Sequence, residues 1–331
     1  MRKDEILKFI KQKKVVPAAE ILNAFDGSKA TILRDIEKLI SEGRVIKSGK
    51  ARATVYAPAI DLDEYFEREP DERKLKSETY NFDVWDEFEN VFSADELRQL
   101  ATKNEEFCEK IKTLSPALFK KEIERLTIEF SWKSSKIEGN TYTLLDTELL
   151  IKENIEAAGK KRQETTMILN HKRALDYIFA EPEYFKPLST KKIQELHQIV
   201  MRDLDVPSDF RLRAVGITGT NYRPLDVRMQ IVEEIGKFIE IINKTANPLQ
   251  KAIITVLMIS YIQPFEDGNK RTARILGNAL LYAHGYCPLS YRSVDEREYK
   301  KAIVLFYEQN DWSYFKRLFT QQFTEALEKY F

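Results

Sequence analysis

Helical spacing of apolar side chains dominates the chain from Ala94 to its end. Between turn signals, apolar residues recur every three or four positions, which predicts a long series of amphipathic helices. The expected helices cover residues 95–114, 116–137, 144–158, 165–179, 190–203, 227–243, 249–262, 269–284, 295–310 and 312–330. Since 43% of the residues are hydrophobic, such a chain has enough apolar surface to bury a large core. We therefore predict a mainly α fold.

The stretch RLRAVGITGTNYRPLD, residues 211–226, interrupts the helical pattern. Four residues that favour a strand precede a Gly-Thr-Asn turn there, namely Ala214, Val215, Ile217 and Thr218. We expect a short exposed β-hairpin at this place, within an otherwise all-α domain.

The first 58 residues predict a different arrangement of elements. These are helices over 3–13, from Pro17, and from Ser28 as N-cap to Gly43 as the stop, then strands over 44–47 and 52–56. The order resembles a winged helix-turn-helix domain, which is a small α+β unit. The third helix would be the recognition helix, and the Gly49-Lys50 turn would be the tip of the wing.

Charge favours nucleic acid as a partner of this front domain. Residues 1–58 hold 13 Lys and Arg against 7 Asp and Glu, a net of +6, whereas the remainder is net −6. A recognition helix needs short polar and basic residues at its front and cations around it for phosphates. The residues available are Lys29, Thr31 and Arg34 for the first role and Lys38, Lys47, Lys50 and Arg52 for the second. Winged domains also serve as docking or dimerisation modules, and that alternative stays open.

Residues 59–96 are acidic, with 14 Asp and Glu against 4 Lys and Arg, and they contain a cluster of aromatic residues. The aromatic side chains indicate that the segment packs. We expect three parts: a winged helix-turn-helix domain over 1–58, an acidic-aromatic ordered connector with a helical region over 59–115, and a helical domain over 116–331. Two cysteines give no disulfide framework, and the charged N-terminus does not resemble a signal peptide. A cytoplasmic protein without a membrane segment is therefore expected.

Residues 262–276, IQPFEDGNKRTARIL, combine a Gly-Asn turn with a helix that carries arginines. A helix that begins at Asn269 presents free N–H groups and the positive end of its dipole, which suit an anion. Arg271 and Arg274 are three positions apart, so they share a face near that end. Asp267, just ahead of the helix, is placed to bind a Mg²⁺ that bridges phosphate oxygens. By itself the pattern also fits an ordinary helix cap with surface charges.

The string QPFEDGNKRTAR resembles, at every position but one, the signature loop of the Fic (Fido) family, His-x-Phe-x-Asp/Glu-Gly-Asn-x-Arg-x-x-Arg. Upstream, SSKIEGN over residues 134–140 resembles the family's inhibitory motif, Ser/Thr-x-x-x-Glu-Gly/Asn. The predicted hairpin, with the helix before it, resembles the family's flap. The resemblance covers roughly Pro116 to the C-terminus. It implies an all-α Fic domain with a β-hairpin flap and an inhibitory helix over 116–140.

The resemblance also implies a site for ATP and Mg²⁺, with Asp267 binding the metal. Arg274 would take the γ-phosphate or, at rest, pair with Glu138 and so keep ATP from binding productively. The other positions carried over are Phe265 and Asn269 beside Gln263 in the catalytic loop, Gly268, Asn269, Lys270 and Arg271 around the phosphates, and Ser134 and Gly139 in the inhibitory motif. Val215, Gly216, Ile217 and Thr218 would form a flap that clamps a target segment as an added strand.

Gln263 stands where the family has a histidine that acts as general base. An amide has no useful basicity near neutral pH, so a contribution of about a hundred- to ten-thousand-fold is expected to be lost. None of the three histidines, His171, His197 and His284, is expected to replace it. Three explanations stay open: a substitution introduced into an active enzyme, a natural pseudoenzyme that binds nucleotide as a signal, or a different reaction. In that last case Glu138 would orient a water or proton, for example to remove AMP from a modified protein.

The predicted function is transfer of AMP from ATP and Mg²⁺ to a Ser, Thr or Tyr hydroxyl of a protein, the chain itself included. It would be restrained by Glu138 and impaired by Gln263. The alternative is a DNA-binding transcriptional regulator whose degenerate Fic domain is a nucleotide sensor or dimerisation module. The expected partners are ATP, a protein target and DNA, without a membrane, and a homo-oligomer is left open.

Overall fold

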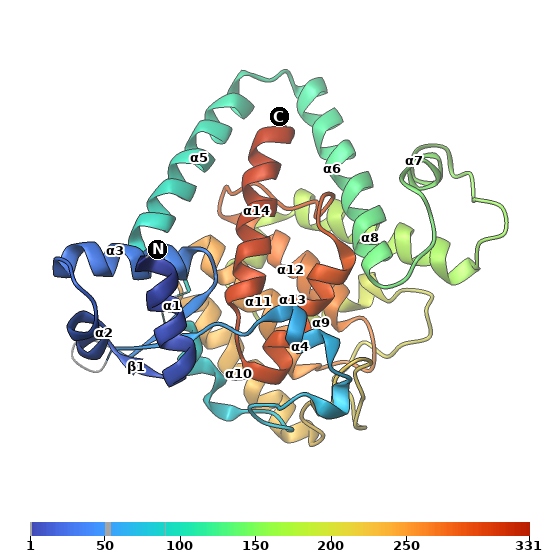
Figure 1. The fold of residues 1–331 in the computed structure, drawn as a ribbon. Coiled ribbons are helices and arrows are strands. Elements are labelled where there is room, and N and C mark those ends of the chain that lie inside the picture. Colours follow the sequence, from blue (N-terminus) through green and yellow to red (C-terminus); the bar gives the residue numbers. More distant parts are fainter. Residues whose placement is uncertain (1, 50–53, 90) are drawn as a thin grey trace. The chain divides into compact units, whose positions relative to one another are not determined.

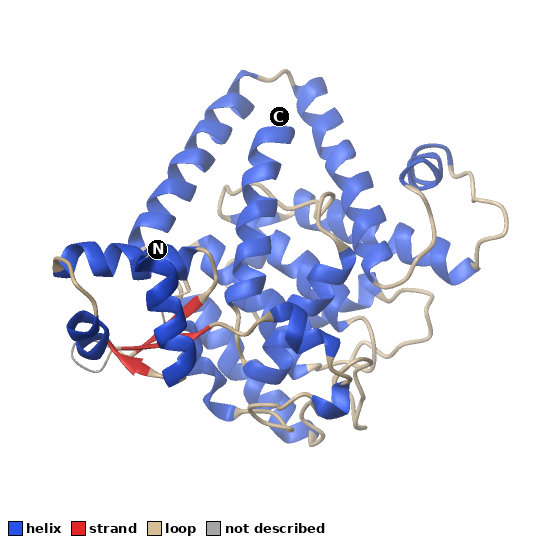
Figure 2. Cartoon of the chain, in the orientation of Figure 1, coloured by secondary structure: helices blue, strands red, loops and turns tan. Residues whose placement is uncertain are grey.

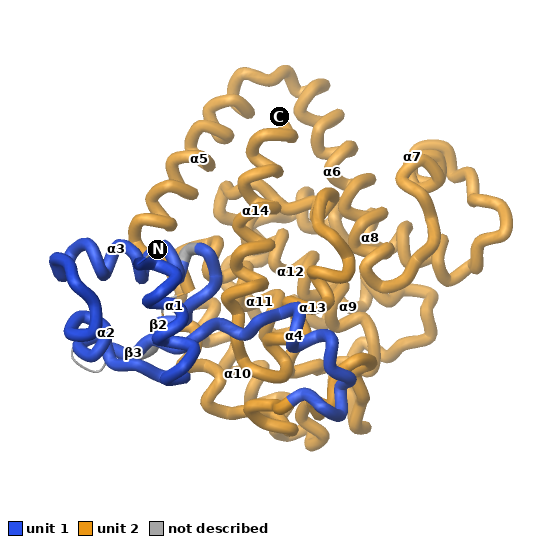
Figure 3. Tube along the Cα trace, in the orientation of Figure 1, with its two compact units in different colours: residues 1–73 blue, residues 74–331 orange. Residues whose placement is uncertain are grey.

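A computed structural model describes residues 2–49, 54–89 and 91–331 of the protein. The chain divides into two compact units, residues 1–73 and 74–331, which Figure 3 draws in blue and orange. All three strands found among the described residues lie in the first unit, whereas the second is built from helices and loops (Figure 2).

The first unit has three helices and a three-stranded sheet, followed by a short helical tail. Its elements are α1 Arg2–Lys13, β1 Val16–Pro17, α2 Ala18–Ala24, α3 Lys29–Ser41, β2 Val45–Ser48, β3 Val55–Pro58, α4 Leu62–Glu67 and the 3₁₀ turn η2 Pro70–Glu72. The strands are antiparallel in the order β1-β3-β2, with Val16 opposite Tyr56 and Ile46 opposite Ala57. The predicted order of helices and hairpin is confirmed. Strand β1 was not predicted, because two residues are too few to show an alternating pattern.

The core of this unit joins one face of each helix to the sheet. Its buried residues are Ile6, Leu7, Ile10, Val16, Ile21, Ile32, Ile36, Leu39, Val45 and Tyr56. The predicted cap of α3 is confirmed, since the Ser28 hydroxyl accepts a hydrogen bond from the Thr31 N–H at 3.2 Å. Gly43 follows the helix with a φ of 66°, a left-handed conformation that glycine adopts without strain, and so ends it as predicted.

The second unit contains ten α-helices in its described part, and Figure 1 shows their arrangement. They are α5 Ala94–Thr113, α6 Pro116–Ile137, α7 Leu144–Glu153, α8 Arg162–Ala180, α9 Thr190–Val200, α10 Arg228–Lys244, α11 Pro248–Ile262, α12 Asn269–Ala283, α13 Glu296–Gln309 and α14 Ser313–Lys329. Two 3₁₀ turns, η3 Phe82–Phe88 and η4 Pro182–Phe185, complete the unit. In the described part of the chain, no helix has both the length and the apolar character needed to cross a membrane.

Two helices end several residues earlier than predicted. Helix α7 ends at Glu153 because Asn154 takes a left-handed conformation with a φ of 56° and caps it. Helix α9 ends at Val200, and Asp203, which was expected to be helical, also has a positive φ of 59°. Helix α6 ends at Ile137, as predicted from its spacing, and Glu138 is its C-cap, so the inhibitory helix expected over 116–140 ends before Glu138.

Helix α11 is deeply buried, with every residue from Lys251 to Ile262 shielded from solvent. It contacts α10, α12 and α13, while α12 in turn contacts α6, α8 and α9. Such burial stabilises the unit by about 25 cal/mol for each Å² of apolar surface removed from water. The turn that joins α11 to α12 is therefore held on a rigid scaffold.

The aromatic segment before α5 packs onto the same scaffold. The Tyr80 hydroxyl and the Trp85 Nε1–H both donate to the Glu234 carboxylate of α10, at 2.5 and 2.7 Å. The backbone N–H of Asn81 donates to the Tyr261 hydroxyl of α11 at 3.0 Å. These bonds give the buried Glu234 carboxylate two donors, and they attach the segment to two helices.

The expected hairpin over residues 211–226 does not form as paired strands, and this part of the prediction is wrong. The segment is an extended loop that turns at Thr218 and Gly219, and no strand ladder joins its two sides. The isolated bridge described in this region pairs Arg223 with Thr79 instead. The side chain of Arg211 joins the two ends of the loop, so backbone pairing is not what closes it.

Candidate functional site

Gln263 lies in the turn between α11 and α12. It has a left-handed conformation, with φ 51° and ψ 59°, and its N–H bonds to the Ile259 carbonyl as the C-cap of α11. Both ends of its buried side chain are satisfied, because Nε2 donates to the Ser260 carbonyl at 2.6 Å and Oε1 accepts from Asn269 Nδ2 at 2.9 Å. The amide therefore helps to hold the turn, but it offers no basic atom at neutral pH.

Asn269 fixes the loop that precedes α12. Its Nδ2 also donates to the Phe265 carbonyl, and its Oδ1 accepts from the Phe265 N–H, each at 2.9 Å. The Phe265 ring is fully buried and stacks on His197 with the ring centroids 3.6 Å apart. These contacts hold the backbone at the start of α12, where the first N–H groups of a helix have no partner within it. The arrangement suits an anion.

Gly268 is a position where only glycine fits. Its φ of 77° is left-handed, and a Cβ atom there would lie 2.4 Å from the Met201 sulfur and 3.4 Å from His197 Nε2. The residues that follow α9 thus come close to the loop backbone, and a larger residue would push them away.

Arg271 and Asp267 form one edge of the site. Arg271 Nη2 lies 2.9 Å from Asp267 Oδ2, while the other oxygen of Asp267 accepts from the Gly268 N–H at 2.5 Å. The Asp267 side chain is 66% exposed, whereas that of Arg271 is 5% exposed. The Nη1 atom of Arg271 is buried and has no hydrogen-bond partner in the described part of the chain. A buried cationic donor without an acceptor marks a place for an anionic oxygen.

Arg274 connects α12 to the end of α6. Its Nε donates to the Ser134 hydroxyl at 2.9 Å, and its Nη2 donates to the Ser134 carbonyl at 3.0 Å and to Glu138 Oε1 at 2.8 Å. The Arg274 side chain is fully buried and that of Glu138 is 19% exposed. Like Arg271, Arg274 has a buried Nη1 without a hydrogen-bond partner among the described residues, and its guanidinium lies beside Tyr299, with 5.5 Å between Cζ and the ring centroid. The structure thus brings Ser134 and Glu138 into contact with Arg274.

The charge of Glu138 is stabilised by its cationic neighbours. Burial by itself would raise the pKa of this carboxyl group, but the charges of Arg274, Lys270 and Arg271 outweigh it and lower the pKa to about 2. Glu138 is therefore ionised at neutral pH. Gly139, directly after it, has a φ of 94°, and a Cβ there would meet no atom within 4 Å.

Two histidines lie close to the site, and sequence reasoning did not foresee their contacts. His197 Nε2 donates to the Asp267 carbonyl at 2.9 Å, and burial lowers the pKa of its ring to about 4. His171 lies 2.9 Å from the Ser134 hydroxyl, and burial, followed by the charges of Arg271 and Arg274, lowers its pKa to about 3. Both rings are buried and neutral at pH 7, and both nitrogens of His171 are bonded. Nδ1 of His197 is shielded from solvent and has no hydrogen-bond partner among the described residues. His284 lies at the far end of α12.

The predicted flap residues lie in the extended loop, with Val215 and Ile217 half-buried and Gly216 and Thr218 exposed. Arg211 holds the base of this loop, although no sequence pattern marked it. Its Nε donates to the Gln263 carbonyl at 2.6 Å, its Nη1 donates to the Arg213 carbonyl at 2.7 Å, and its Nη2 bonds to the Leu225 carbonyl. A single buried guanidinium therefore joins the loop to the turn that carries Gln263.

Of the predicted DNA-contacting residues, Lys29, Thr31, Arg34 and Lys38 lie on α3 of the first unit, and Lys47 lies on β2. Lys29 and Arg34 are exposed, as are Lys38 and Lys47. The Thr31 hydroxyl lies 2.7 Å from the Ser28 hydroxyl, so it belongs to the helix cap. Lys50 and Arg52, at the predicted wing, lie outside the described residues.

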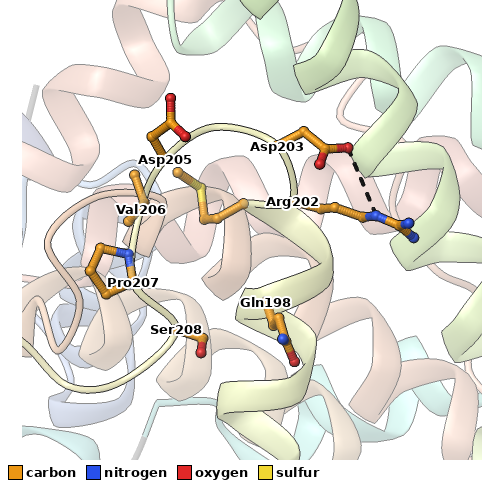
Figure 4. A pocket seen from close by; sticks show the side chains of 8 residues that line it. Gln198, Arg202, Asp203, Asp205, Val206, Pro207 and Ser208 are labelled. Atoms are coloured by element: carbon orange, nitrogen blue, oxygen red, sulfur yellow. Dashed lines mark ion pairs between the residues drawn. The ribbon is translucent and has the colours of Figure 1, made fainter.

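A pocket of about 610 Å³ lies beside the loop after α9 (Figure 4). It is lined by Gln198, Met201, Arg202, Asp203, Asp205, Val206, Pro207 and Ser208. Met201 also contacts the surroundings of Gly268, so the pocket adjoins the site. In Figure 4 the Asp203 carboxylate points toward Arg202, with 3.8 Å between the charged atoms. The lining includes none of the predicted phosphate-binding residues, so pocket and predicted site are separate places.

Comparison with known proteins finds a separate family match in each of the two units. Residues 187–281 match the Fic/DOC family, and residues 2–52 match a DeoR-like helix-turn-helix domain. A protein adenylyltransferase Fic from Nematostella vectensis is 28% identical over 188 residues, which are 54% of this chain and 43% of that protein. The protein of the same name from Drosophila erecta is 33% identical over 163 residues, covering 48% and 32%. This chain spans less than half the length of either relative.

Solved structures resemble the chain over a larger part of its length. Fic-1 from C. elegans is 20% identical with a TM-score of 0.62, covering 71% of this chain and 70% of that one. A Fic domain-containing signaling protein from Bacteroides thetaiotaomicron is 22% identical with a TM-score of 0.59, covering 70% and 94%. At these identities the likeness establishes the fold of the helical part.

Proposed function

We propose that the helical unit binds ATP with Mg²⁺ and transfers AMP to hydroxyl groups of proteins. This unit contains the Fic/DOC-family domain, which follows the DeoR-like helix-turn-helix domain in the chain. At rest Glu138 obstructs this site through its pair with Arg274. Because Gln263 replaces the base, transfer by this chain is slow. The target is a Ser, Thr or Tyr hydroxyl of a protein, the chain itself included.

The observation that carries this proposal is the pair of arginines with unused donors. Arg271 and Arg274 each keep a buried Nη1 without a partner, at the beginning of a helix whose own N–H groups need an anion. Glu138 is the one carboxylate bonded to Arg274 in the described structure. A carboxylate in that position occupies the guanidinium that a terminal phosphate would need, which supports an obstructing role.

In AMP transfer, the oxygen of the target hydroxyl bonds to the α-phosphorus while the bond to the β-phosphate oxygen breaks, and pyrophosphate leaves. The hydroxyl proton needs an acceptor. The Gln263 amide supplies none, so about a hundred- to ten-thousand-fold of acceleration is absent. The loop, α12 and the two arginines still orient the phosphates, and positioning alone contributes to the rate.

The residues present fit a magnesium ion. Asp267 offers an exposed carboxylate at the edge of the site, beside the Arg271 guanidinium with its unused donor. Magnesium is commonly held by one or two carboxylates together with phosphate oxygens and water. When bound, the ion would neutralise phosphate charge, and Asp267 would hold it on the protein side.

Labelled ATP tests the proposal. The double variant Gln263→His, Glu138→Gly is expected to label itself or an added protein extract, whereas Glu138→Gly alone binds Mg·ATP and transfers little. The double variant Gln263→Met, Glu138→Gly is the matched control, because it fills the position without a base. Binding without transfer in the histidine variant would contradict the transferase function. Absence of Mg·ATP binding in every Glu138→Gly protein would contradict the nucleotide site.

A second function, DNA binding with the helical unit as a nucleotide sensor or dimerisation module, is favoured by one observation. Lys29 and Arg34 are exposed near the start of α3, within the part that matches the DeoR-like domain. Phosphate contacts release counterions, so binding to random duplex should weaken steeply as salt rises. The variant Arg34→Ala should bind more weakly than the wild type in a mobility-shift assay. No shift at low salt would leave docking as the role of this unit.

A further inference from the structure

His171, in the middle of α8, contacts the Arg274–Glu138 pair only through another residue. The ring is fully buried and packs against Phe130 of α6 with the centroids 5.8 Å apart. Its Nε2 lies 2.9 Å from the Ser134 hydroxyl, and its Nδ1 lies 2.8 Å from the Met167 carbonyl. Ser134 in turn accepts from Arg274. A chain of hydrogen bonds therefore runs from α12 through α6 into α8.

The direction of these hydrogen bonds follows from the donors at each end. Arg274 Nε–H only donates, so the Ser134 oxygen accepts from it at 2.9 Å. At the other end two groups face Nδ1: the Met167 carbonyl at 2.8 Å, which only accepts, and the Ser135 hydroxyl at 3.2 Å, which can take either role. The closer contact assigns the proton of the neutral ring to Nδ1. The Ser134 proton then has His171 Nε2, a lone-pair acceptor, as its partner.

We propose that His171 is a positioning residue of the nucleotide site. By accepting the Ser134 proton, it turns the Ser134 oxygen toward Arg274 and holds the guanidinium with Nη1 open to a phosphate. This inference rests on the proposed function, because the orientation of Arg274 matters only if Arg274 binds phosphate. His171 touches no substrate, and its effect passes through Ser134.

The experiment compares two replacements in the Glu138→Gly protein, where Arg274 is free to bind nucleotide. His171→Phe keeps a ring of similar volume but removes the acceptor, whereas His171→Gln can place an amide oxygen near the position of Nε2. We expect His171→Phe to weaken Mg·ATP binding about tenfold by calorimetry, the effect of one hydrogen bond to a charged group. His171→Gln should recover most of that loss. Adding Ser134→Ala to His171→Phe should weaken binding little further, because both act on one contact.

Nitrogen NMR of ¹⁵N-histidine protein gives a readout that does not depend on nucleotide. The chain has three histidines, and the signals of His171 are identified by their loss in His171→Gln. The expected signals are those of a neutral ring with the proton on Nδ1, and Ser134→Ala should shift the Nε2 signal. A proton on Nε2 would overturn the proposed hydrogen-bond direction.

The outcomes separate the two proposals. If Glu138→Gly binds Mg·ATP and His171→Phe binds it equally tightly, the positioning role is wrong while the nucleotide site stands. If His171→Gln loses as much affinity as His171→Phe, the acceptor is not what matters, and the role is again wrong. If Glu138→Gly itself does not bind Mg·ATP, the proposed function fails first.

Discussion

The Glu138 carboxylate stabilises the folded protein to an extent that depends on pH. Its pKa falls from an ordinary value of 4.5 to about 2 in the folded protein, so the folded state favours the ionised form. A carboxyl group whose pKa is lower in the folded state stabilises the fold when the pH is above its unfolded pKa. This stabilisation is lost as the pH falls through the folded pKa. The contribution of Glu138 is therefore complete above about pH 5 and disappears between pH 4.5 and pH 2.

We expect Glu138→Gln to lower the free energy of unfolding by about 2 kcal/mol at pH 7, because a buried guanidinium loses its counter-charge. Urea unfolding of wild type and variant at pH 7, 5, 4 and 3 measures the difference. The gap should stay constant down to about pH 5 and then narrow. A gap that does not change with pH would mean that the charge of Glu138 contributes nothing.

Gly268 allows a second prediction at the residue scale, with Gly159 as its control. Both have nearly the same left-handed φ, 77° and 74°, but a Cβ at Gly159 meets nothing within 4 Å, whereas one at Gly268 collides with Met201. Gly159→Ala should cost about 1 kcal/mol, the strain of a left-handed alanine. Gly268→Ala should cost about 1–3 kcal/mol more from overpacking. Equal losses in chemical denaturation would show that the Met201 side chain moves away at no cost.

At the scale of the element, α6 is fastened to its neighbours by buried charges. Lys133 Nζ donates to the Val294 carbonyl at 3.0 Å and to Glu296 at 2.5 Å, and the Lys133 side chain is 7% exposed. One turn earlier, Glu129 pairs with Arg292 at 2.5 Å. Moving this helix would break both pairs. Release of Glu138 is therefore easier by rotation at its own C-cap, next to Gly139, than by departure of α6.

The variant Lys133→Met tests how firmly α6 is held. It keeps most of the side-chain volume but leaves Glu296 without its closest cation, so we expect a loss of about 2 kcal/mol in unfolding free energy. Lys121→Met, on an exposed position of the same helix, should change stability by less than about 0.5 kcal/mol. Denaturant melts of both variants give the comparison, and equal effects would contradict the anchoring role of Lys133.

Elements with strong periodicity were predictable, and contacts between elements were not. The limits of α6 agree with its pattern because Pro116 at the first position and Gly139 beyond the end are local signals. The loop over 211–226 looked like a hairpin because its composition suits strands, but Arg211 closes it by contacts far along the chain. For the same reason the contact between Glu138 and Arg274 could be expected from the motifs, whereas the contact between Ser134 and His171 could not.

At the scale of the whole molecule, the unfolding of the two units can be followed by different probes. The three tryptophans, Trp85, Trp132 and Trp312, all lie in the second unit, whereas helix content is present in both. Tryptophan fluorescence therefore follows unfolding of residues 74–331 alone, while far-ultraviolet circular dichroism follows both units. If the units unfold independently, the dichroism curve should show two transitions and the fluorescence curve only one of them.

A ligand that binds only the second unit must then shift only that transition. At a hundred times its dissociation constant, Mg·ATP stabilises the binding unit by about 2.7 kcal/mol, which raises Tm by about 5–10 °C for a unit of this size. We expect this shift in the fluorescence melt of Glu138→Gly and in the matching phase of its dichroism melt. A smaller shift is expected in the wild type, because there the nucleotide must first displace Glu138 from Arg274. If Mg·ATP raises the melting temperatures of both dichroism transitions, unfolding of the first unit depends on nucleotide held by the second. A nucleotide sensor that controls DNA binding then becomes the better proposal for the function.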